Sequence, residues 1–265
     1  MMEPTIGLAL GAGSARGLAH IGVLKALEEE EIKIDYIAGT SAGAIIGGFY
    51  AAGLDLHMLE RLATHLEWDN LTDITLPRQG LIAGDKMKEF FQLLTKRKEF
   101  SDLELPFAAV ATDIEKGENV VIDSSSVAEG LRASMSVPGV FVPHKLEDRL
   151  LVDGALLNRI PTAEVRNLGA DIVIGVEVSP IDSQSRAVNN IFDVIMNSID
   201  IMQQELAQSK RVGADLLIEP DLAGIGATEL ERSQECINLG YQAAQENIEA
   251  IKKLINRGLE SEEAN

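Results

Sequence analysis

A serine between two glycines is the first candidate for chemistry in this chain. Residues 39–43, GTSAG, form a G-x-S-x-G pattern centred on Ser41. The preceding residues 34–38 are rich in β-branched and aromatic types, and residues 44–52 are mostly small and apolar. Strand, G-x-S-x-G and helix is the context of a nucleophile elbow, in which a tight turn lifts the hydroxyl above the strand end. Gly39 and Gly43 permit that turn, and a helix N-terminus at Ser41 favours developing negative charge.

A glycine-rich loop near the start of the chain offers a second part of such a site. Gly11, Gly13 and Gly17 follow an apolar strand and precede a helix, which resembles a dinucleotide-binding turn and would indicate an NAD(P)-dependent reductase. The acid expected about 20 residues further on has no clear counterpart, because Asp35 lies before or early in the next strand. No tyrosine is followed four residues later by a lysine. The same loop geometry suits an oxyanion hole, which we favour.

The serine also needs a base, and a carboxylate is better placed than any histidine. Only His144 lies far enough downstream of Ser41 for the order serine, acid, histidine, and Asp113, the acid between them, leads into a turn. Asp153 ends an apolar strand and precedes Gly154, so we expect its carboxylate at the same sheet edge as Ser41. Asp-Gly alone is often a plain turn, but beside the elbow and the glycine loop we interpret Asp153 as the base. The four histidines have no metal-ligand spacing and no cysteine partner, so no metal site is predicted.

Apolar and periodic stretches predict the elements that position these residues. Strands are expected over 5–10, 34–38, 107–112, 118–122, 149–153 and 172–178. Helices are expected over 18–30, 44–52, 85–95, 126–135 and 161–168, with a further one that Asp55 caps. Apolar stripes over 192–206 and 237–255 predict two long helices with a strand between them. The alternation of strand, loop and helix in the first fifty residues predicts a parallel sheet covered by helices.

The three motifs, taken in order and spacing, resemble the patatin-like phospholipase family, in particular its small bacterial members. The glycine loop 11–17, the elbow 39–43 and the Asp153-Gly154 pair carry the resemblance, and stretches 18–24 and 133–143 are also similar to the family pattern. The likeness covers about residues 5 to 180. It implies a three-layer α/β/α sandwich with a mainly parallel central sheet. It also implies hydrolysis of lipid carboxylic esters through an acyl-serine intermediate, without a cofactor.

The resemblance also assigns roles to particular residues. Ser41 would be the nucleophile and Asp153 the base of a Ser-Asp dyad. The oxyanion hole would come from the loop residues Ala12, Gly13 and Ser14, supported by the motif residues Gly11, Arg16, Gly17, Gly39, Gly43 and Gly154. Arg16 would brace the loop or steady an anionic head group. Ala12 and Ser14 interrupt the family's usual run of glycines; they keep their backbone N–H groups but disfavour positive φ.

Composition narrows the class of protein. The chain of 265 residues has 46% hydrophobic residues and a formal net charge of −19. This charge argues against a nucleic-acid partner, because a phosphate backbone requires a basic stripe and the sequence shows none. We expect a lipid or ester substrate and at most peripheral membrane contact. The sequence also permits a homo-oligomer. A single cysteine, Cys236, and the lack of a leader-like or membrane-spanning stretch predict a cytoplasmic protein. One domain is expected over 1–265, with the motif-bearing core at about 5–180 and a helical part at about 186–258.

One further interpretation stays open beside the hydrolase and the reductase. A protein with this fold and little activity could act as a regulator that binds a protein partner through its helical C-terminal third. A purified protein that cleaves no ester but forms a specific complex would favour the regulator.

Overall fold

The central feature of the computed structural model is a mixed sheet, to which the described residues contribute eight strands. The structure describes residues 3–65, 71–74, 80–179, 188, 191, 194–195, 197–199, 201–202 and 213–263. The strands are β1 (Ile6–Leu10), β2 (Tyr36–Thr40), β3 (Phe107–Asp113), β4 (Glu118–Ile122), β5 (His144–Leu146), β6 (Arg149–Asp153), β7 (Ile172–Val176) and β8 (Leu216–Ile218). Their order is β5-β6-β3-β2-β1-β7-β8, and β4 also pairs with β3. The pairs from β3 through β2, β1 and β7 to β8 are parallel, whereas β4, β5 and β6 pair antiparallel.

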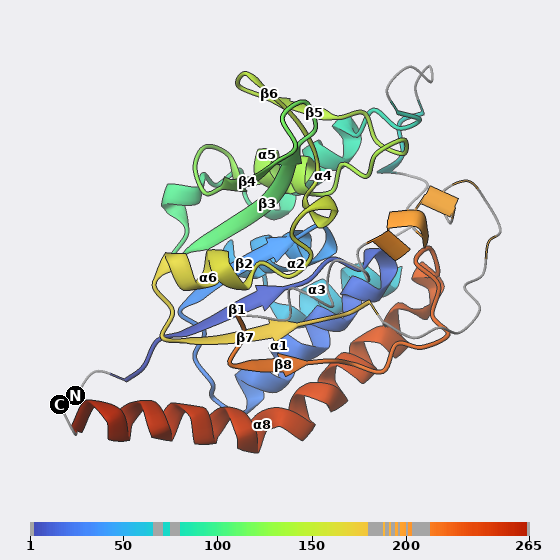
Figure 1. Cartoon of the computed structure of the whole chain (residues 1–265). Helices are drawn as coiled ribbons and strands as arrows, with labels where there is room; N and C mark the ends of the chain where they lie inside the picture. Colours follow the sequence, from blue (N-terminus) through green and yellow to red (C-terminus); the bar gives the residue numbers. More distant parts are fainter. Residues whose placement is uncertain are drawn as a thin grey trace.

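Helices cover both faces of this sheet (Figure 1). The longer ones are α1 (Ala19–Glu29), α2 (Ala42–Ala51), α3 (Leu56–His65), α4 (Asp85–Leu94), α5 (Val127–Ser134), α6 (Thr162–Leu168) and α8 (Ser233–Glu263). Short 3-10 turns are η1 (Ser14–Leu18), η3 (Phe100–Asp102), η4 (Gly154–Leu156) and η5 (Leu230–Arg232). The result is the three-layer α/β sandwich that the sequence predicts.

The two faces of the sheet are covered differently. Alternate strand residues point to opposite faces, so Leu8 and Leu10 of β1 join the large core that includes residues of α1, α2, α5 and α8. Ala9 faces the other way, into a small cluster with Val165 of α6. Small side chains on that face let α6 pack closely against the strands. The larger core therefore lies on the side of α2, the helix that follows the elbow.

The register of β3 brings the ends of two other strands together. Thr40, at the end of β2, pairs with Val110, and Asp153, at the end of β6, pairs with the next residue, Ala111. Val110 and Ala111 both pair with β4 as well, so β2 and β6 must share the opposite edge of β3. Because β2 runs parallel and β6 antiparallel to β3, their carboxyl ends meet head to head. This arrangement places Ser41, the residue after Thr40, beside Asp153.

Most predicted elements are confirmed to within one or two residues at each end. The strands predicted over 118–122 and 149–153 match β4 and β6, and Asp55 caps α3 through an Oδ1 acceptor 2.9 Å from the N atom of Met58. β5 was not predicted, and the glycine loop continues into η1 rather than directly into the helix. The helix predicted over 192–206 falls partly outside the described residues; those of its residues that are described are helical as far as Met202.

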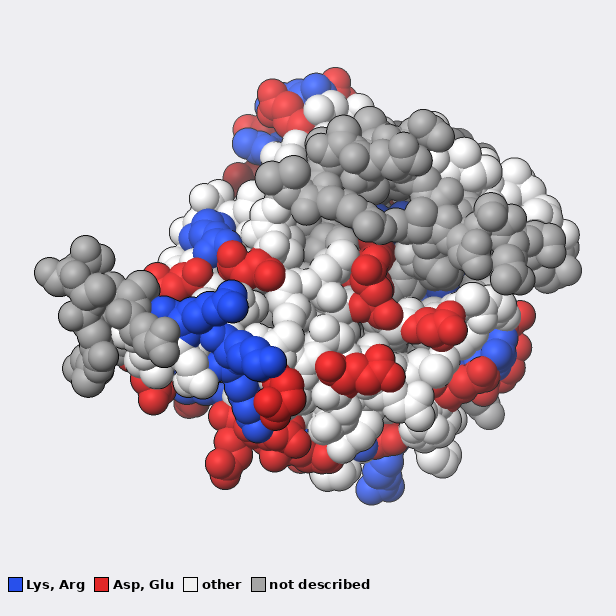
Figure 2. All heavy atoms as spheres, turned by 60° about the horizontal axis from the view of Figure 1, so that its bottom comes forward, with Lys and Arg blue, Asp and Glu red and all other residues white. Residues whose placement is uncertain are grey.

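Charged side chains are spread over the surface that α8 covers. Figure 2 shows acidic side chains distributed across this face, together with a smaller basic group, in keeping with the net charge of −19. Within the described ranges, no helix is long and apolar enough to cross a bilayer.

Candidate active site

Ser41 occupies a strained turn between β2 and α2. Its backbone has φ 55° and ψ −120°, a conformation that a non-glycine residue adopts only where the surrounding structure holds it. The Ser41 N–H donates to the Ser134 hydroxyl at 2.8 Å, and that hydroxyl donates to the Val110 carbonyl at 2.6 Å. Ser134 thus ties the elbow to β3 at the register position where β2 ends.

Close backbone approach explains the glycines around the elbow. A Cβ on Gly43 would lie 2.2 Å from the Leu10 carbonyl oxygen, and a Cβ on Gly154 would lie 2.3 Å from the Val110 carbonyl oxygen. Neither backbone neighbour can move aside cheaply, so both positions require glycine. Gly17 and Gly39 crowd against residues at the start of α2, whereas a Cβ on Gly11 would lie 2.7 Å from the Val176 carbonyl oxygen at the end of β7.

Asp153 is a buried carboxylate that faces the serine. The residue is 4% exposed, Oδ1 accepts the Ala155 N–H at 2.8 Å, and the Ser41 side chain lies close enough to lower the pKa of the carboxyl group. Burial raises the pKa of Asp153 from 3.8 to about 6, while the Ser41 side chain, the bond from Ala155 and the charge of Arg159 oppose that rise. A carboxylate with such a pKa is a better proton acceptor than an exposed aspartate and is still ionised at neutral pH.

The turn after α5 holds both residues from the same side. Ser134 accepts from the Ser41 N–H, and two residues later the Ser136 carbonyl accepts from the Asp153 N–H at 2.9 Å. Sequence reasoning did not single out Ser134, although it lies in the stretch 133–143 that resembles the family pattern. Its role could not be predicted from spacing, because it depends on the contact between α5 and β3.

The first two residues of the glycine loop have bonded backbone N–H groups, and the next two differ. The N–H of Gly11 donates to Val176 and the N–H of Ala12 donates to the Arg159 carbonyl, both at 3.0 Å. Ala12 is therefore already engaged, whereas within the described part of the chain no acceptor bonds the N–H of Gly13 or of Ser14. Ser14 adopts a φ of 51° despite its side chain, and Ala12 does not need a positive φ. Although Ala12 and Ser14 replace glycines, the N–H groups of Gly13 and Ser14 stay available as donors near Ser41.

Two buried side chains lie behind this loop. His20 of α1 is fully buried, and its Nε2 lies 2.8 Å from the Gly11 carbonyl oxygen. Burial lowers the pKa of His20 to about 4, so the ring is neutral and donates from Nε2 to the carbonyl. Arg16 is also buried, and it lines a small cavity of about 10 Å³ together with Ser41 and Asp153. That volume holds about one water.

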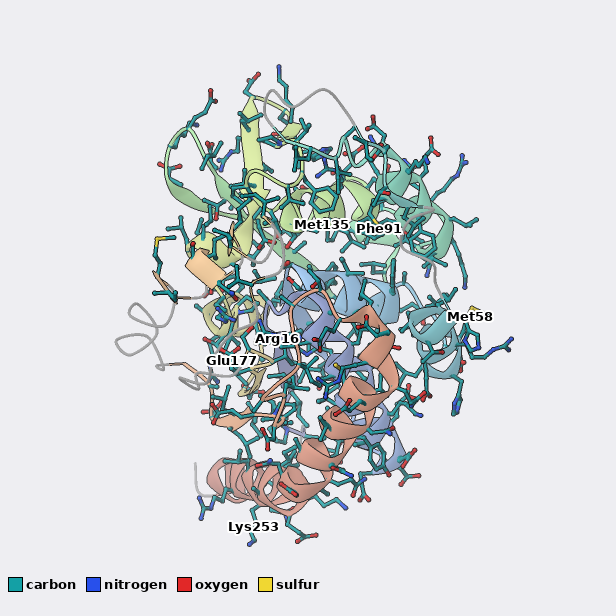
Figure 3. All side chains as sticks on the ribbon, turned by 90° about the vertical axis from the view of Figure 1, so that its right-hand side faces the viewer. Arg16, Met58, Phe91, Met135, Glu177 and Lys253 are labelled. Atoms are coloured by element: carbon teal, nitrogen blue, oxygen red, sulfur yellow. The ribbon has the colours of Figure 1, made fainter. Side chains whose placement is uncertain are left out.

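A larger apolar cavity opens on the other side of Ser41. It has a volume of about 290 Å³ and is lined by Ser14 and Ser41 at one end and otherwise mainly by aliphatic and aromatic side chains. Ile45 and Phe49 follow Ser41 at helical spacing along α2, and Phe91 of α4 packs edge-on against Phe49 with ring centroids 5.8 Å apart. In Figure 3, Phe91 and Met135 lie inside the molecule, whereas Met58 points outward from α3. The shape and lining suit a hydrocarbon chain.

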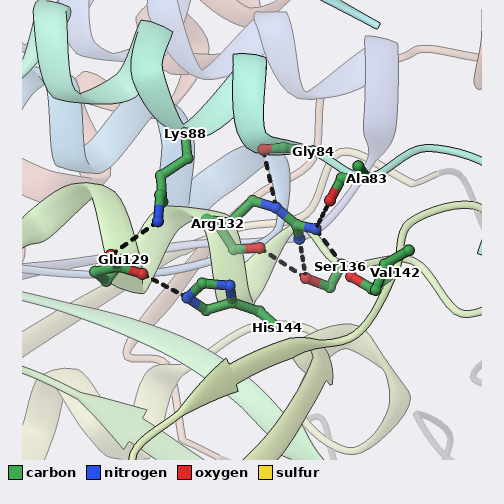
Figure 4. A network of polar contacts seen from close by, with 8 residues as sticks. All are labelled: Ala83, Gly84, Lys88, Glu129, Arg132, Ser136, Val142 and His144. Carbon is green, nitrogen blue, oxygen red and sulfur yellow. Dashed lines mark hydrogen bonds and ion pairs between the residues drawn. The ribbon is translucent and has the colours of Figure 1, made fainter. Parts of the chain in front are cut away.

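A buried arginine holds two walls of this cavity together (Figure 4). Arg132 of α5 donates to the carbonyls of Gly84, Ala83 and Val142 at 3.1, 2.6 and 2.8 Å and to the Ser136 hydroxyl at 2.5 Å. Its guanidinium also lies 5.5 Å from the centroid of the Phe141 ring. The loop before α4 and the loop after α5, which both line the cavity, are therefore fixed to one side chain.

The alternative acid and base candidates lie apart from the serine. His144 bonds Glu129 at 2.6 Å, and Asp113 accepts from the backbone of Glu115 and Lys116 in the turn after β3. Over the described ranges, no group of three or more His, Cys, Asp or Glu side chains could hold a metal ion. The structure thus brings together Ser41, Asp153 and the glycine loop, and it leaves His144 and Asp113 in other networks.

The sandwich and the elbow define a class of α/β proteins with a serine above the carboxyl ends of parallel strands. The sequence profile of the patatin-like phospholipases matches residues 8–166, and the chain belongs to that family.

Curated relatives are longer than this chain. An uncharacterized NTE family protein of Mycobacterium tuberculosis, Rv1063c, is 37% identical over 180 residues, which cover 67% of this chain and 50% of that protein. Lysophospholipase nte1 of Emericella nidulans is 29% identical over 278 residues, covering 93% of this chain and 18% of the relative. The chain thus spans half or less of the length of these relatives.

Solved structures share the fold at low sequence identity. VipD from Legionella pneumophila superposes with a TM-score of 0.65 at 14% identity, over 94% of this chain and 67% of VipD. The type III effector protein ExoU gives a TM-score of 0.52 at 14% identity, over 94% of this chain and 53% of ExoU.

Proposed function

We propose that this chain is a serine hydrolase that cleaves carboxylic esters of lipids through a Ser41-Asp153 dyad. The observation that carries the proposal is the buried Asp153 carboxylate beside a strained Ser41: both residues line one small cavity, and Ser41 also lines the large apolar cavity. Family membership and the lysophospholipase name of one relative support the same reaction class.

Acylation would begin with the Ser41 hydroxyl. Its Oγ attacks the ester carbonyl carbon while its proton passes to the Asp153 carboxylate, and the carbonyl electron pair moves to oxygen. The N–H groups of Gly13 and Ser14 are the donors available to that oxyanion, and one such donor is worth about 3–4 kcal/mol of barrier. The intermediate then collapses, the alcohol takes the proton from Asp153, and the acyl group stays on Ser41.

Deacylation would use the same groups in reverse. Asp153 takes a proton from a water, the resulting hydroxide attacks the acyl carbon, and the proton returns to Oγ as the acid leaves. The small cavity beside the dyad has room for about one water. Ala12 would support the loop rather than donate, because its N–H is bound to Arg159.

The shape of the site indicates which part of a lipid goes where. The acyl chain would lie along α2 in the cavity of about 290 Å³, and the alcohol part would leave on the side of the small cavity that Asp153 lines. Among the described residues, a cavity of this size beside the nucleophile suits a substrate with a single long acyl chain.

Covalent labelling tests the proposal directly. The wild-type protein, Ser41→Ala and Asp153→Asn are incubated with a fluorophosphonate, and the adduct is located by peptide mass. We expect an adduct on Ser41 that Asp153→Asn slows by about a hundredfold or more, a typical size for loss of a general base. Ester hydrolysis that persists in the Ser41→Ala protein would falsify the assignment. Folded wild-type protein that takes no label and cleaves no ester would favour the regulator.

A further inference from the structure

Large apolar side chains are exposed in three segments around the site. Ile74 is 88% exposed and Leu81 is 40% exposed, and both precede α4 in the chain. In the later helical segment, Ile191, Val194, Ile201 and Met202 are between 45% and 61% exposed. We call these six residues the apolar rim. They are six of the eleven large hydrophobic side chains that are exposed among the described residues.

Specific contacts join the segments of the apolar rim to one another. Leu81 and Ile82 both donate backbone hydrogen bonds to the Val140 carbonyl, at 2.8 and 2.9 Å, and Ile74 forms a β-bridge with Ile82. Gly139, next to Val140, packs against Ile195: a Cβ built on Gly139 would lie 3.2 Å from the Ile195 Cδ1 atom. All three segments therefore converge on the loop that follows α5.

The apolar rim is also continuous with the dyad and the large cavity. Ile199, one helical turn after Ile195, is 8% exposed and lines the small cavity with Ser41 and Asp153. Ile82 and Val140 line the large cavity. The segments that carry the apolar rim therefore border both cavities.

We propose that the apolar rim docks on the surface of a zwitterionic lipid aggregate, so that a lipid can pass into the cavity without crossing water. The proposal rests on the lipid ester activity proposed above. The described rim residues are aliphatic or Met, and such side chains gain free energy by entering hydrocarbon. A net charge of −19 opposes pairing with a second copy and docking on anionic lipid.

Vesicle flotation separates docking from catalysis. The Ser41→Ala protein is floated with phosphatidylcholine vesicles, alone and with Leu81→Asp and Ile201→Asp added. The matched control adds Ile114→Asp and Val121→Asp, which lie on the β3–β4 hairpin at 45% and 44% exposure. We expect the rim pair to lower the vesicle partition coefficient by about tenfold per side chain, and the hairpin pair to leave it within about twofold.

The outcomes distinguish failure of docking from failure of the proposed function. No flotation of the Ser41→Ala protein, or equal losses from the rim and hairpin pairs, would overturn the docking proposal. A lipid-free dimer that the rim pair dissociates would assign the surface to a second copy and would also overturn it. Rim-dependent flotation of a protein that hydrolyses no ester would keep the docking surface and remove the hydrolase. With Ser41 restored, the rim pair should hydrolyse a soluble butyrate ester at the wild-type rate, which shows that the variant is folded.

Discussion

At the scale of single residues, the decisive property is the protonation of Asp153. The pKa of about 6 arises because burial disfavours the charged carboxylate more than its partners restore it. The base in the proposed mechanism is the ionised form. The rate therefore depends on a group that titrates just below neutral pH.

Fluorophosphonate labelling should rise with pH through about 6. Deprotonation of Asp153 creates the proton acceptor, so the rate constant should increase about tenfold per unit below pH 6 and level off above pH 7. Initial labelling rates between pH 4.5 and 8 check this, with protein concentrations matched and folding monitored by circular dichroism. A rate that is flat from pH 4.5 to 8 would contradict the assignment of Asp153 as the base.

The same carboxylate makes a signed prediction about stability. A raised pKa in the folded state means that Asp153 favours folding below its unfolded value near 3.8, and that this contribution is lost as the pH rises to about 6. Asp153→Asn should therefore increase the free energy of unfolding at pH 8, by on the order of 1–3 kcal/mol. The gain should disappear near pH 3.5. Urea unfolding at both pH values measures it, and a variant less stable than wild type at pH 8 would show that the ionised carboxylate is not a cost.

At the scale of secondary structure elements, Arg132 fastens α5 to two loops that wall the apolar cavity. It is 3% exposed and donates to three carbonyls and a hydroxyl. Asp73, Asp85 and Glu129 act on it through charge alone. The planar guanidinium of arginine carries several N–H donors in fixed directions and can reach all four acceptors at once, whereas a lysine ammonium cannot.

Arg132→Lys should therefore destabilise the protein although the charge is kept. Loss of two or more bonds to buried carbonyls should cost about 3 kcal/mol in the free energy of unfolding. Arg257→Lys on the exposed side of α8 is the control and should change stability by less than about 0.5 kcal/mol. Equal, small effects of both substitutions in urea unfolding would mean that the fork geometry is not needed.

α2 sets the dimension of the cavity, because residues one and two turns beyond Ser41 line it. Ile45→Trp should fill the cavity near the nucleophile and lower kcat/KM for decanoate esters by about tenfold or more, with little change for acetate esters. Tyr50→Trp, on the same helix but outside the cavity lining, is the matched control. Parallel losses on short and long esters would indicate damage to the dyad rather than to the chain pocket.

Across the whole molecule, the sequence predicted the parts of the site better than their assembly. The motifs at Ser41 and Asp153 and the strands that carry them have strong local patterns, since each depends on a few neighbouring residues. β5 has three residues and no period, so no pattern could reveal it. The bond from Ser41 to Ser134, the engagement of Ala12 with Arg159 and the cavity lining depend on side chains from distant elements, and their register is a tertiary property.

The head-to-head meeting of β2 and β6 on one edge of β3 has a consequence for the life of the chain before it is complete. Ser41 and Asp153 are 112 positions apart in the sequence, and each reaches the other only when its own strand has docked next to Val110 or Ala111. Contacts of such long sequence separation form late and slowly. If Asp153 activates Ser41 as proposed, a nascent or partly folded chain carries an unactivated serine until β2 and β6 have both paired with β3.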